Sequence, residues 1–104
     1  MSKKLKPIHP GEQLREEFML PLGLSSNALA RALGVTPARI NDIVRGRRGI
    51  SADTALRLER FFGASHQFWL NLQANYDVRR AEDKAGARIA KIKPREKSHA
   101  SAAA

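Results

Sequence analysis

The chain has 104 residues, which is enough for one hydrophobic core but not for two. It has no cysteine, so the sequence excludes disulfide bonds and thiolate metal sites. Its 19 lysines and arginines outnumber its 10 acidic residues, and the resulting net charge of +9 predicts attraction to polyanions, nucleic acid first.

The sequence contains no segment that predicts a membrane location. No apolar run approaches the roughly 18 residues that a membrane-spanning helix needs. The basic N-terminus, MSKKLKPIHP, lacks the apolar stretch of a signal peptide. We therefore expect a cytoplasmic protein without a membrane partner.

Clear start and stop signals predict two short helices in the first third of the chain. The first is expected over residues 10–20, because proline suits the first turn of a helix and Pro21 ends it. The second is expected after a serine cap, at Ser25 or Ser26, and closes at Gly34.

The middle of the chain predicts two more helices by the same signals. Thr36 caps the third helix, with Pro37 in its first position, and Gly46 terminates it. Ser51 opens the fourth helix, whose apolar residues recur at spacings of three and four, and Gly63 ends it.

Ser65 caps a fifth predicted helix, and the character of the sequence changes beyond it. Residues 77–93 carry a thin apolar stripe that extends this helix at the cost of an interior glycine, Gly86, worth about 1 kcal/mol. After Pro94 the sequence has no large apolar residue, which predicts disorder.

No short segment alternates apolar and polar residues between turn signals, so no sheet is expected. The predicted fold is all-α, with five short helices. We divide the chain into a basic N-terminal arm over residues 1–7, a helical domain over 8–78, and a basic tail over 79–104 that is partly helical and then disordered.

The second and third helices have the features of a helix-turn-helix. A small residue, Ala30, stands where two helices would cross, and Gly34 supplies a tight turn between them. At 100° per residue, Ile40, Ile43 and Val44 define the inward side of the third helix. The residues opposite or flanking that side are Ala38, Arg39, Asn41, Asp42 and Arg45.

This outward face has the chemistry of a DNA-reading helix. Arg39, Asn41 and Arg45 carry the side chains that bond guanine and adenine in bidentate fashion, and Ala38 is short enough to meet a thymine methyl. Asp42 can accept a hydrogen bond from a cytosine amino group, provided that an arginine, Arg45 or Arg39, offsets its charge near phosphate.

Two neighbouring segments predict contacts to the DNA backbone. The loop RGRRGIS brings Arg47 and Arg48 next to Arg45, as a clamp for phosphates. The start of the second helix, with Ser26 and Asn27, offers backbone amides, because helix N-termini attract anions.

The remaining polar and aromatic residues have plainer explanations. His9, His66 and His99 share no metal-ligand spacing, and Glu16–Glu17 fits a solvated helix surface. Phe68 and Trp69 fit a core or a dimer interface better than a base-stacking platform. We expect no catalytic residue, no metal and no cofactor, and therefore no enzyme.

Residues 8–76 resemble the HigA-type (VapI-type) antitoxins of the lambda-repressor-like helix-turn-helix superfamily. The resemblance rests on four stretches, which are HPGEQLREEF, PLGLSSNALARALGV, INDIVRGRRGIS and ALRLERFFGASHQFWLNLQANYD. The last two are the more specific. The residues on either side, including the basic tail, lie outside the match.

This resemblance implies a lambda-repressor-like five-helix domain in an antitoxin that dimerises and represses its own operon. It implies two further partners, a palindromic DNA operator and a toxin that cleaves mRNA. The family's groove-reading positions fall on Thr36, Pro37, Ala38, Arg39 and Asp42. Its dimer contacts are expected on the fifth helix, at Phe68, Trp69, Leu72 and Tyr76. Proline and alanine side chains donate no hydrogen bond, so readout here leans on Arg39, Asn41 and Arg45.

Two other interpretations remain compatible with the sequence. A stand-alone transcriptional regulator of the same fold needs no toxin. A protein-interaction module or small RNA-binding protein would use the basic tail in place of the third helix.

Overall fold

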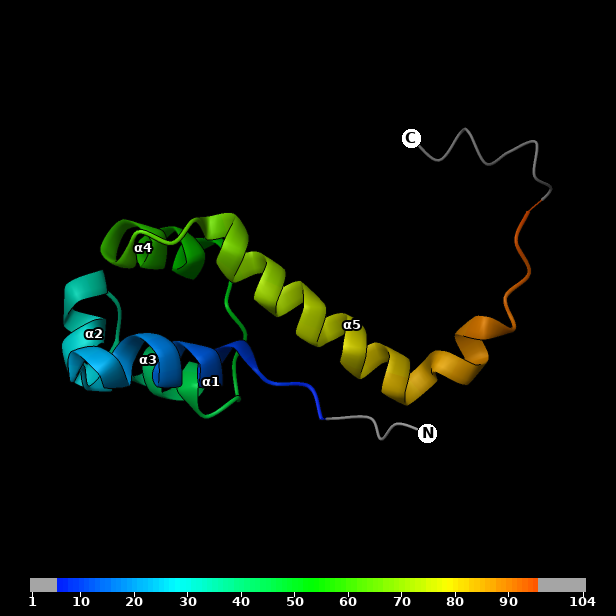
Figure 1. The fold of residues 1–104 in the computed structure, drawn as a ribbon, viewed down its shortest axis with the longest axis horizontal. Helices are drawn as coiled ribbons and strands as arrows, with labels where there is room; N and C mark the ends of the chain where they lie inside the picture. Colours follow the sequence, from blue (N-terminus) through cyan, green and yellow to red (C-terminus); the bar gives the residue numbers. More distant parts are fainter. Residues whose placement is uncertain (1–5, 96–104) are drawn as a thin grey trace.

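The structure is a computed structural model that describes residues 6–95. Within this part of the chain it has five α-helices and no strand, which confirms the predicted all-α fold (Figure 1). Most of the predicted N-terminal arm, residues 1–5, and of the predicted disordered tail, residues 96–104, lies outside the described residues. No helix within 6–95 combines the length and the apolar character needed to cross a bilayer.

The first helical segment continues further than predicted. It begins as α1 (Pro10–Gln13), widens into a π-helical stretch over Leu14–Met19 and tightens into a 3₁₀ turn over Leu20–Leu22. The prediction that Pro21 ends the helix is therefore wrong, because proline is tolerated in the first positions of this new turn. The reversal falls instead on Gly23, whose φ of 66° favours glycine.

Helices α2 (Ser26–Leu33), α3 (Pro37–Val44) and α4 (Ala52–Phe62) follow the predicted caps. Ser25 is the cap of α2, since its hydroxyl accepts a hydrogen bond from the Ala28 N–H at 3.0 Å. The Thr36 hydroxyl accepts from the Arg39 N–H at 3.2 Å, and Ser51 caps α4 in the same way. Each cap satisfies a donor that the first turn leaves free, so local sequence fixes all three starts.

Helix α5 (His66–Ala90) is by far the longest element, with 25 residues, and it changes direction in its C-terminal part (Figure 1). The predicted extension beyond residue 77 is present, and the helix passes Gly86 and the predicted 78/79 boundary without interruption. Its first turns lie against α4, while its C-terminal part projects away from the helical body (Figure 1). The division at 78/79 stays a prediction, because the side chains on both sides of it are exposed or half-buried within one continuous helix.

The core lies between the first helical segment, α2, α3, α4 and the start of α5. Its fully or nearly fully buried apolar side chains are Leu14, Met19, Leu29, Ala30, Leu33, Ile40, Ile43, Ile50, Ala55, Leu58 and Trp69. Trp69 has no exposed surface, and its ring meets those of Phe18 and Phe68 at centroid distances of 4.7 and 5.0 Å. Its predicted place in a dimer interface is therefore wrong, because a side chain enclosed by its own chain has no surface to offer a second one.

Helix α1 approaches α3 so closely that only glycine fits at Gly11. A Cβ there would lie 1.7 Å from the Ile43 carbonyl oxygen. The preceding residue, His9, caps α1, with its Nδ1 accepting from the Gly11 N–H at 2.8 Å. The His9 ring also meets Tyr76 of α5 edge-on at 4.8 Å, so this imidazole joins the two ends of the domain.

We expect the stability of the domain to fall as pH drops below about 6.5, the ordinary pKa of histidine. Burial lowers the pKa of His9 and Arg80 lowers it further, while Asp77 opposes them. The folded chain thus prefers neutral His9, and the unfolded chain binds the proton more readily between the two pKa values. Melting temperatures measured from pH 7.5 to 5.5 should show the loss.

The matched control is His9→Asn, which keeps a good helix cap but does not titrate. Its melting temperature should change less with pH over the same range. Equal pH dependence in the two proteins would contradict the role given to His9.

Candidate nucleic-acid interface

Helix α3 is held against α2 by its apolar side and leaves its predicted outer face accessible. Ile40 and Ile43 are fully buried. Ala38 and Arg45 are exposed on the opposite side, with Thr36 and Pro37 exposed at the start of the helix. Asn41 and Asp42 are half-buried. The inward and outward sides derived from helical periodicity are therefore confirmed, and the outward side of α3 is available for contact.

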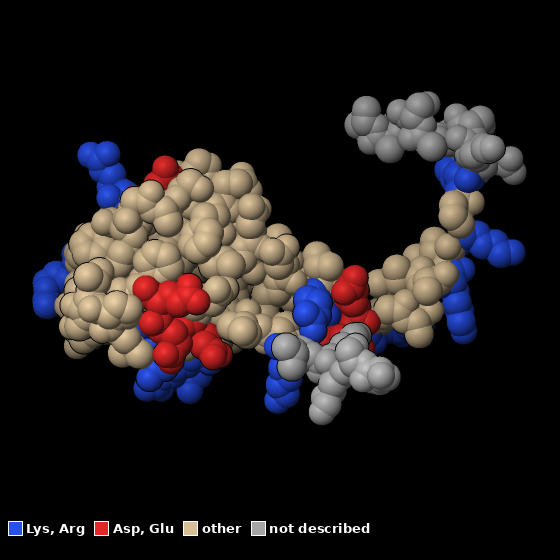
Figure 2. All heavy atoms as spheres, in the orientation of Figure 1, with Lys and Arg blue, Asp and Glu red and all other residues tan. Residues whose placement is uncertain are grey.

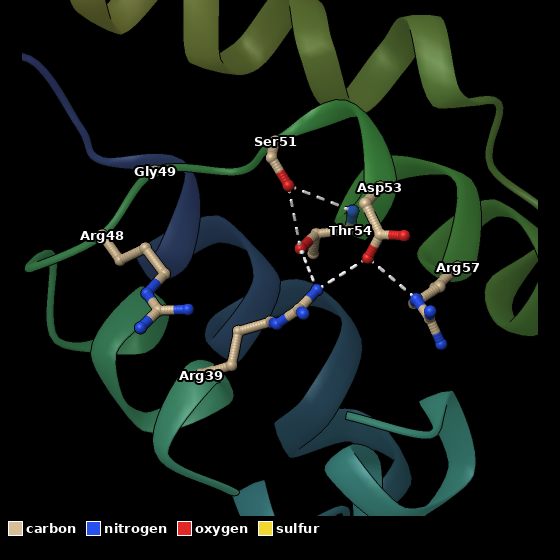
Figure 3. A pocket seen from close by; sticks show the side chains of 7 residues that line it. All are labelled: Arg39, Arg48, Gly49, Ser51, Asp53, Thr54 and Arg57. Atoms are coloured by element: carbon tan, nitrogen blue, oxygen red, sulfur yellow. Dashed lines mark hydrogen bonds and ion pairs between the residues drawn. The ribbon is translucent and has the colours of Figure 1, made fainter. Parts of the chain in front are cut away.

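Arg39 does not extend outward with these residues. Its Nη1 donates to Asp53 Oδ2 at 2.7 Å and to Thr54 Oγ1 at 3.2 Å, so its guanidinium lies against the start of α4 (Figure 3). These partners lie 14 and 15 positions away along the chain, so no local pattern predicts them. In this structure the predicted base-reading arginine is occupied within its own chain.

Asp42 is paired, but with a different arginine from those expected. Its Oδ2 lies 3.5 Å from Arg48 Nη2, and neither Arg45 nor Arg39 is its partner in an ion pair. The turn after α3 explains this, because the Arg47 N–H donates to the Asp42 carbonyl at 2.8 Å and folds the loop back over the helix end. Asp42, a predicted base contact, therefore lies next to Arg48, a predicted phosphate contact.

The arginine loop is exposed but anchored at its far end. Arg45, Arg47 and Arg48 are all exposed, whereas Ile50 is buried. The Ile50 N–H donates to Gln73 Oε1 of α5 at 2.7 Å, which fastens the loop to the last helix. Gln73 was missed by sequence reasoning, because an amide on a helix surface carries no signal of a partner 23 residues away.

The predicted contacts at the start of α2 are arranged around the Ser25 cap. Asn27 is exposed, and Ser26 is half-buried as the first residue of the helix. The free amides of this first turn point out of the N-terminus, where the helix dipole favours an anion. This geometry suits a phosphate of the DNA backbone.

Charge is distributed unevenly over the surface. Figure 2 shows a patch of acidic side chains on the face drawn, over the region where Figure 1 places α1, while basic side chains stand out at the edges of the body and along the end of α5. In this view the acidic patch and most of the basic side chains of the body are therefore separated, with the basic groups at its edges.

The other predicted dimer residues keep some accessible surface. Phe68, Leu72 and Tyr76 are half-buried in the single chain. Tyr76 contacts His9 and accepts a hydrogen bond from Arg80 Nη1 at 3.0 Å. These side chains can contribute to an interface only with the part of their surface that the core leaves uncovered.

Asp53 and Arg57 are further site residues that sequence reasoning did not single out. Arg57 Nε donates to Asp53 Oδ2 at 2.9 Å. The hydrogen bond from Arg39, followed by that from Arg57, holds the pKa of the Asp53 carboxyl below its usual value. The spacing of four between an acidic and a basic residue on one helix was a usable signal for this pair. Among residues 6–95, no group of three His, Asp or Glu side chains is placed to hold a metal ion.

The geometry of α2, the glycine turn and α3 defines a helix-turn-helix protein. A helix-turn-helix family model matches residues 14–69, and the chain belongs to this family.

Two relatives are similar to this chain over most of its length. Virulence-associated protein I of Dichelobacter nodosus is 61% identical over 79 residues, which are 76% of this chain and 73% of the relative. Antitoxin HigA-1 of Vibrio cholerae is 36% identical over 75 residues, 72% of this chain and 70% of the relative.

A solved structure of a HigA antitoxin is also similar to this chain, in both sequence and fold. The antitoxin HigA of Pseudomonas aeruginosa, solved with the higBA promoter, has a TM-score of 0.82 and 52% identity, covering 86% of this chain and 98% of that one. The resemblance to HigA-type antitoxins is therefore confirmed.

Proposed function

We propose that the chain binds duplex DNA by placing α3 in the major groove. The observation that carries this proposal is the accessible face of α3, with Ala38, Asn41 and Arg45 beside an exposed arginine loop. Asn41 and Arg45 would contact base edges, and Asp42 would contribute where a cytosine amino group faces it. Arg47, Arg48 and the first turn of α2 would hold phosphates and fix the register. The solved relative with promoter DNA supports this arrangement.

We further propose that the protein is the antitoxin of a type II toxin–antitoxin pair, acting in the cytoplasm without enzymatic activity. It would form a homodimer through the uncovered parts of Phe68, Leu72 and Tyr76, bind a palindromic operator at its own promoter and neutralise an mRNA-cleaving toxin. The two HigA relatives named above support this role. A two-fold dimer would present its two α3 helices to major grooves about one DNA turn apart.

The test has two arms, which separate DNA binding from toxin binding. Footprinting on the promoter of the chain's own gene should protect two half-sites about one turn apart. Co-expression with the product of the adjacent reading frame should yield a complex that survives purification. A footprint without such a complex would favour a stand-alone regulator, and absence of any footprint would contradict the DNA-binding proposal.

The matched variants for the first arm are Asn41→Ala and Asn75→Ala. Asn41 lies on the proposed reading face, whereas Asn75 is exposed on α5. Loss of a bidentate adenine contact costs about 1–3 kcal/mol, so Asn41→Ala should weaken operator binding by about 5- to 150-fold per contact and relax preference at one position of each half-site. Asn75→Ala should bind like the wild type.

A further inference from the structure

One carboxylate at the start of α4 receives arginines from two directions. Asp53 Oδ2 accepts from Arg39 Nη1 of α3 at 2.7 Å and from Arg57 Nε, one turn further along α4, at 2.9 Å. Figure 3 shows both guanidiniums converging on this oxygen. A single charged group therefore ties the predicted DNA-reading helix to the helix behind it.

The same network reaches the other half of the helix-turn-helix. Arg57 Nη1 donates to the carbonyl of Leu33 at 2.8 Å, which is the last residue of α2. Arg39 also bonds the hydroxyl of Thr54, a side chain that is only 2% exposed and that lies within hydrogen-bond distance of Ser51 Oγ. Both helices of the motif are thus connected to the first turn of α4 through Asp53.

The surroundings show what the carboxylate restrains. Arg39, Arg48 and Arg57 line one open hollow of about 350 Å³, and Asp53 is the acidic residue among the side chains that line it. Arg39 is still 29% exposed, so its guanidinium lies at the surface and not in the core. Without Asp53, a long flexible cation would be released on the first turn of α3, beside the arginine loop.

We propose that Asp53 is a positioning residue that fixes α3 on α4 and withholds Arg39 from the DNA backbone. This inference rests on the proposed function, in which α3 enters the groove. A free arginine at that place would bind any phosphate and would raise affinity for all sequences alike. Holding it on the protein therefore favours the operator over random DNA.

The test is the salt dependence of binding to a random duplex, compared between wild type and Asp53→Asn. Each phosphate contact adds about 0.9 to the slope of log K against log salt. Release of Arg39 in both protomers of a dimer should steepen the slope by about two and lower the preference for the operator. A merely structural role for Asp53 would lower the melting temperature and leave the slope unchanged.

Three further variants test whether release of Arg39 causes the steeper slope. Glu59→Gln removes the same charge from α4, but Glu59 pairs with His66 at 2.7 Å and is remote from Arg39 in the ion-pair network, so the wild-type slope should remain. Asp53→Glu keeps a carboxylate on the same turn and should also keep that slope. Adding Arg39→Gln to Asp53→Asn should abolish the steepening.

Equal slopes for Asp53→Asn and Glu59→Gln, or steepening that persists without Arg39, would overturn the inference. Failure of the proposed function has a separate signature, because it appears in the wild type as equal affinity for the promoter and for random DNA. The slope comparison is made on random DNA and does not depend on that preference.

Discussion

Replacing Trp69 by alanine is expected to lower the free energy of unfolding by about 3–5 kcal/mol. Small domains have a total stability of about 5–15 kcal/mol, so this variant should lose a large share of its stability and unfold at a clearly lower urea concentration. The physical reason is the enclosure of the indole, which has no exposed surface and contacts the rings of Phe18 and Phe68. Urea denaturation followed by circular dichroism measures the loss without relying on tryptophan fluorescence.

Trp69→Phe is the matched control. It keeps an aromatic ring in the cluster and removes the indole Nε1, which is buried without a hydrogen-bond partner among the described residues. An unsatisfied buried donor costs about 1–3 kcal/mol, so its removal offsets part of the lost packing. Trp69→Phe should therefore remain folded. A Trp69→Ala protein within about 1 kcal/mol of wild type would refute the core role.

The second large effect is expected from the double substitution of Arg47 and Arg48 by alanine. We expect four or five phosphate contacts per protomer, hence about eight to ten per dimer and a slope of log K against log salt near −7 to −9. Removing about four contacts should flatten the slope by roughly four. Both side chains are exposed, so the fold should be unaffected. Binding should weaken about equally on all sequences, because phosphates carry no base identity.

A variant with the same charge change separates this loop from net charge. Lys91 and Lys93 are exposed at and just beyond the end of α5, and their replacement by alanine also removes two positive charges per chain. If the loop binds phosphate, the Lys91/Lys93 variant should keep nearly the full slope. If the basic tail makes most of the phosphate contacts, the Lys91/Lys93 variant should show the flatter slope and the Arg47/Arg48 variant should keep the wild-type slope. In that case the assignment of Arg47 and Arg48 is wrong.

The fold was largely predictable, because its helix boundaries depend on local chemistry. Ser51 and Ser65 cap the helices that follow them, and Gly34 and Gly63 close helices in left-handed backbone conformations. Each capping serine and each closing glycine lies within four residues of the helix boundary that it marks, so these boundaries can be predicted from the sequence. The π-helical stretch over Leu14–Met19 has no such local signal, and it carries the first helical segment past the proline that was expected to end it.

The site was predictable only where the exposure of a side chain follows from its position on its own helix. The outward face of α3 follows from periodicity, so the accessibility of Ala38 and Arg45 was available from the sequence. The partners of Arg39 and Asp42 depend on how helices and loops meet in space. Trp69 shows the same limit, because a large apolar residue on a helix fits a core and an interface equally well until its neighbours are known.

Helix α5 also makes the assembly state of the protein measurable by amide hydrogen exchange. Its backbone hydrogen bonds run without interruption from the buried turn around Trp69 to a stretch beyond Val78 that is mostly exposed within the described chain. In a lone protomer, amides near Trp69 should exchange through rare global unfolding, and those between Ala81 and Ala90 through frequent local opening. Slow exchange in that outer stretch that appears only at high protein concentration would show a second molecule lying on it, so the rates along one helix distinguish a free chain from a covered one.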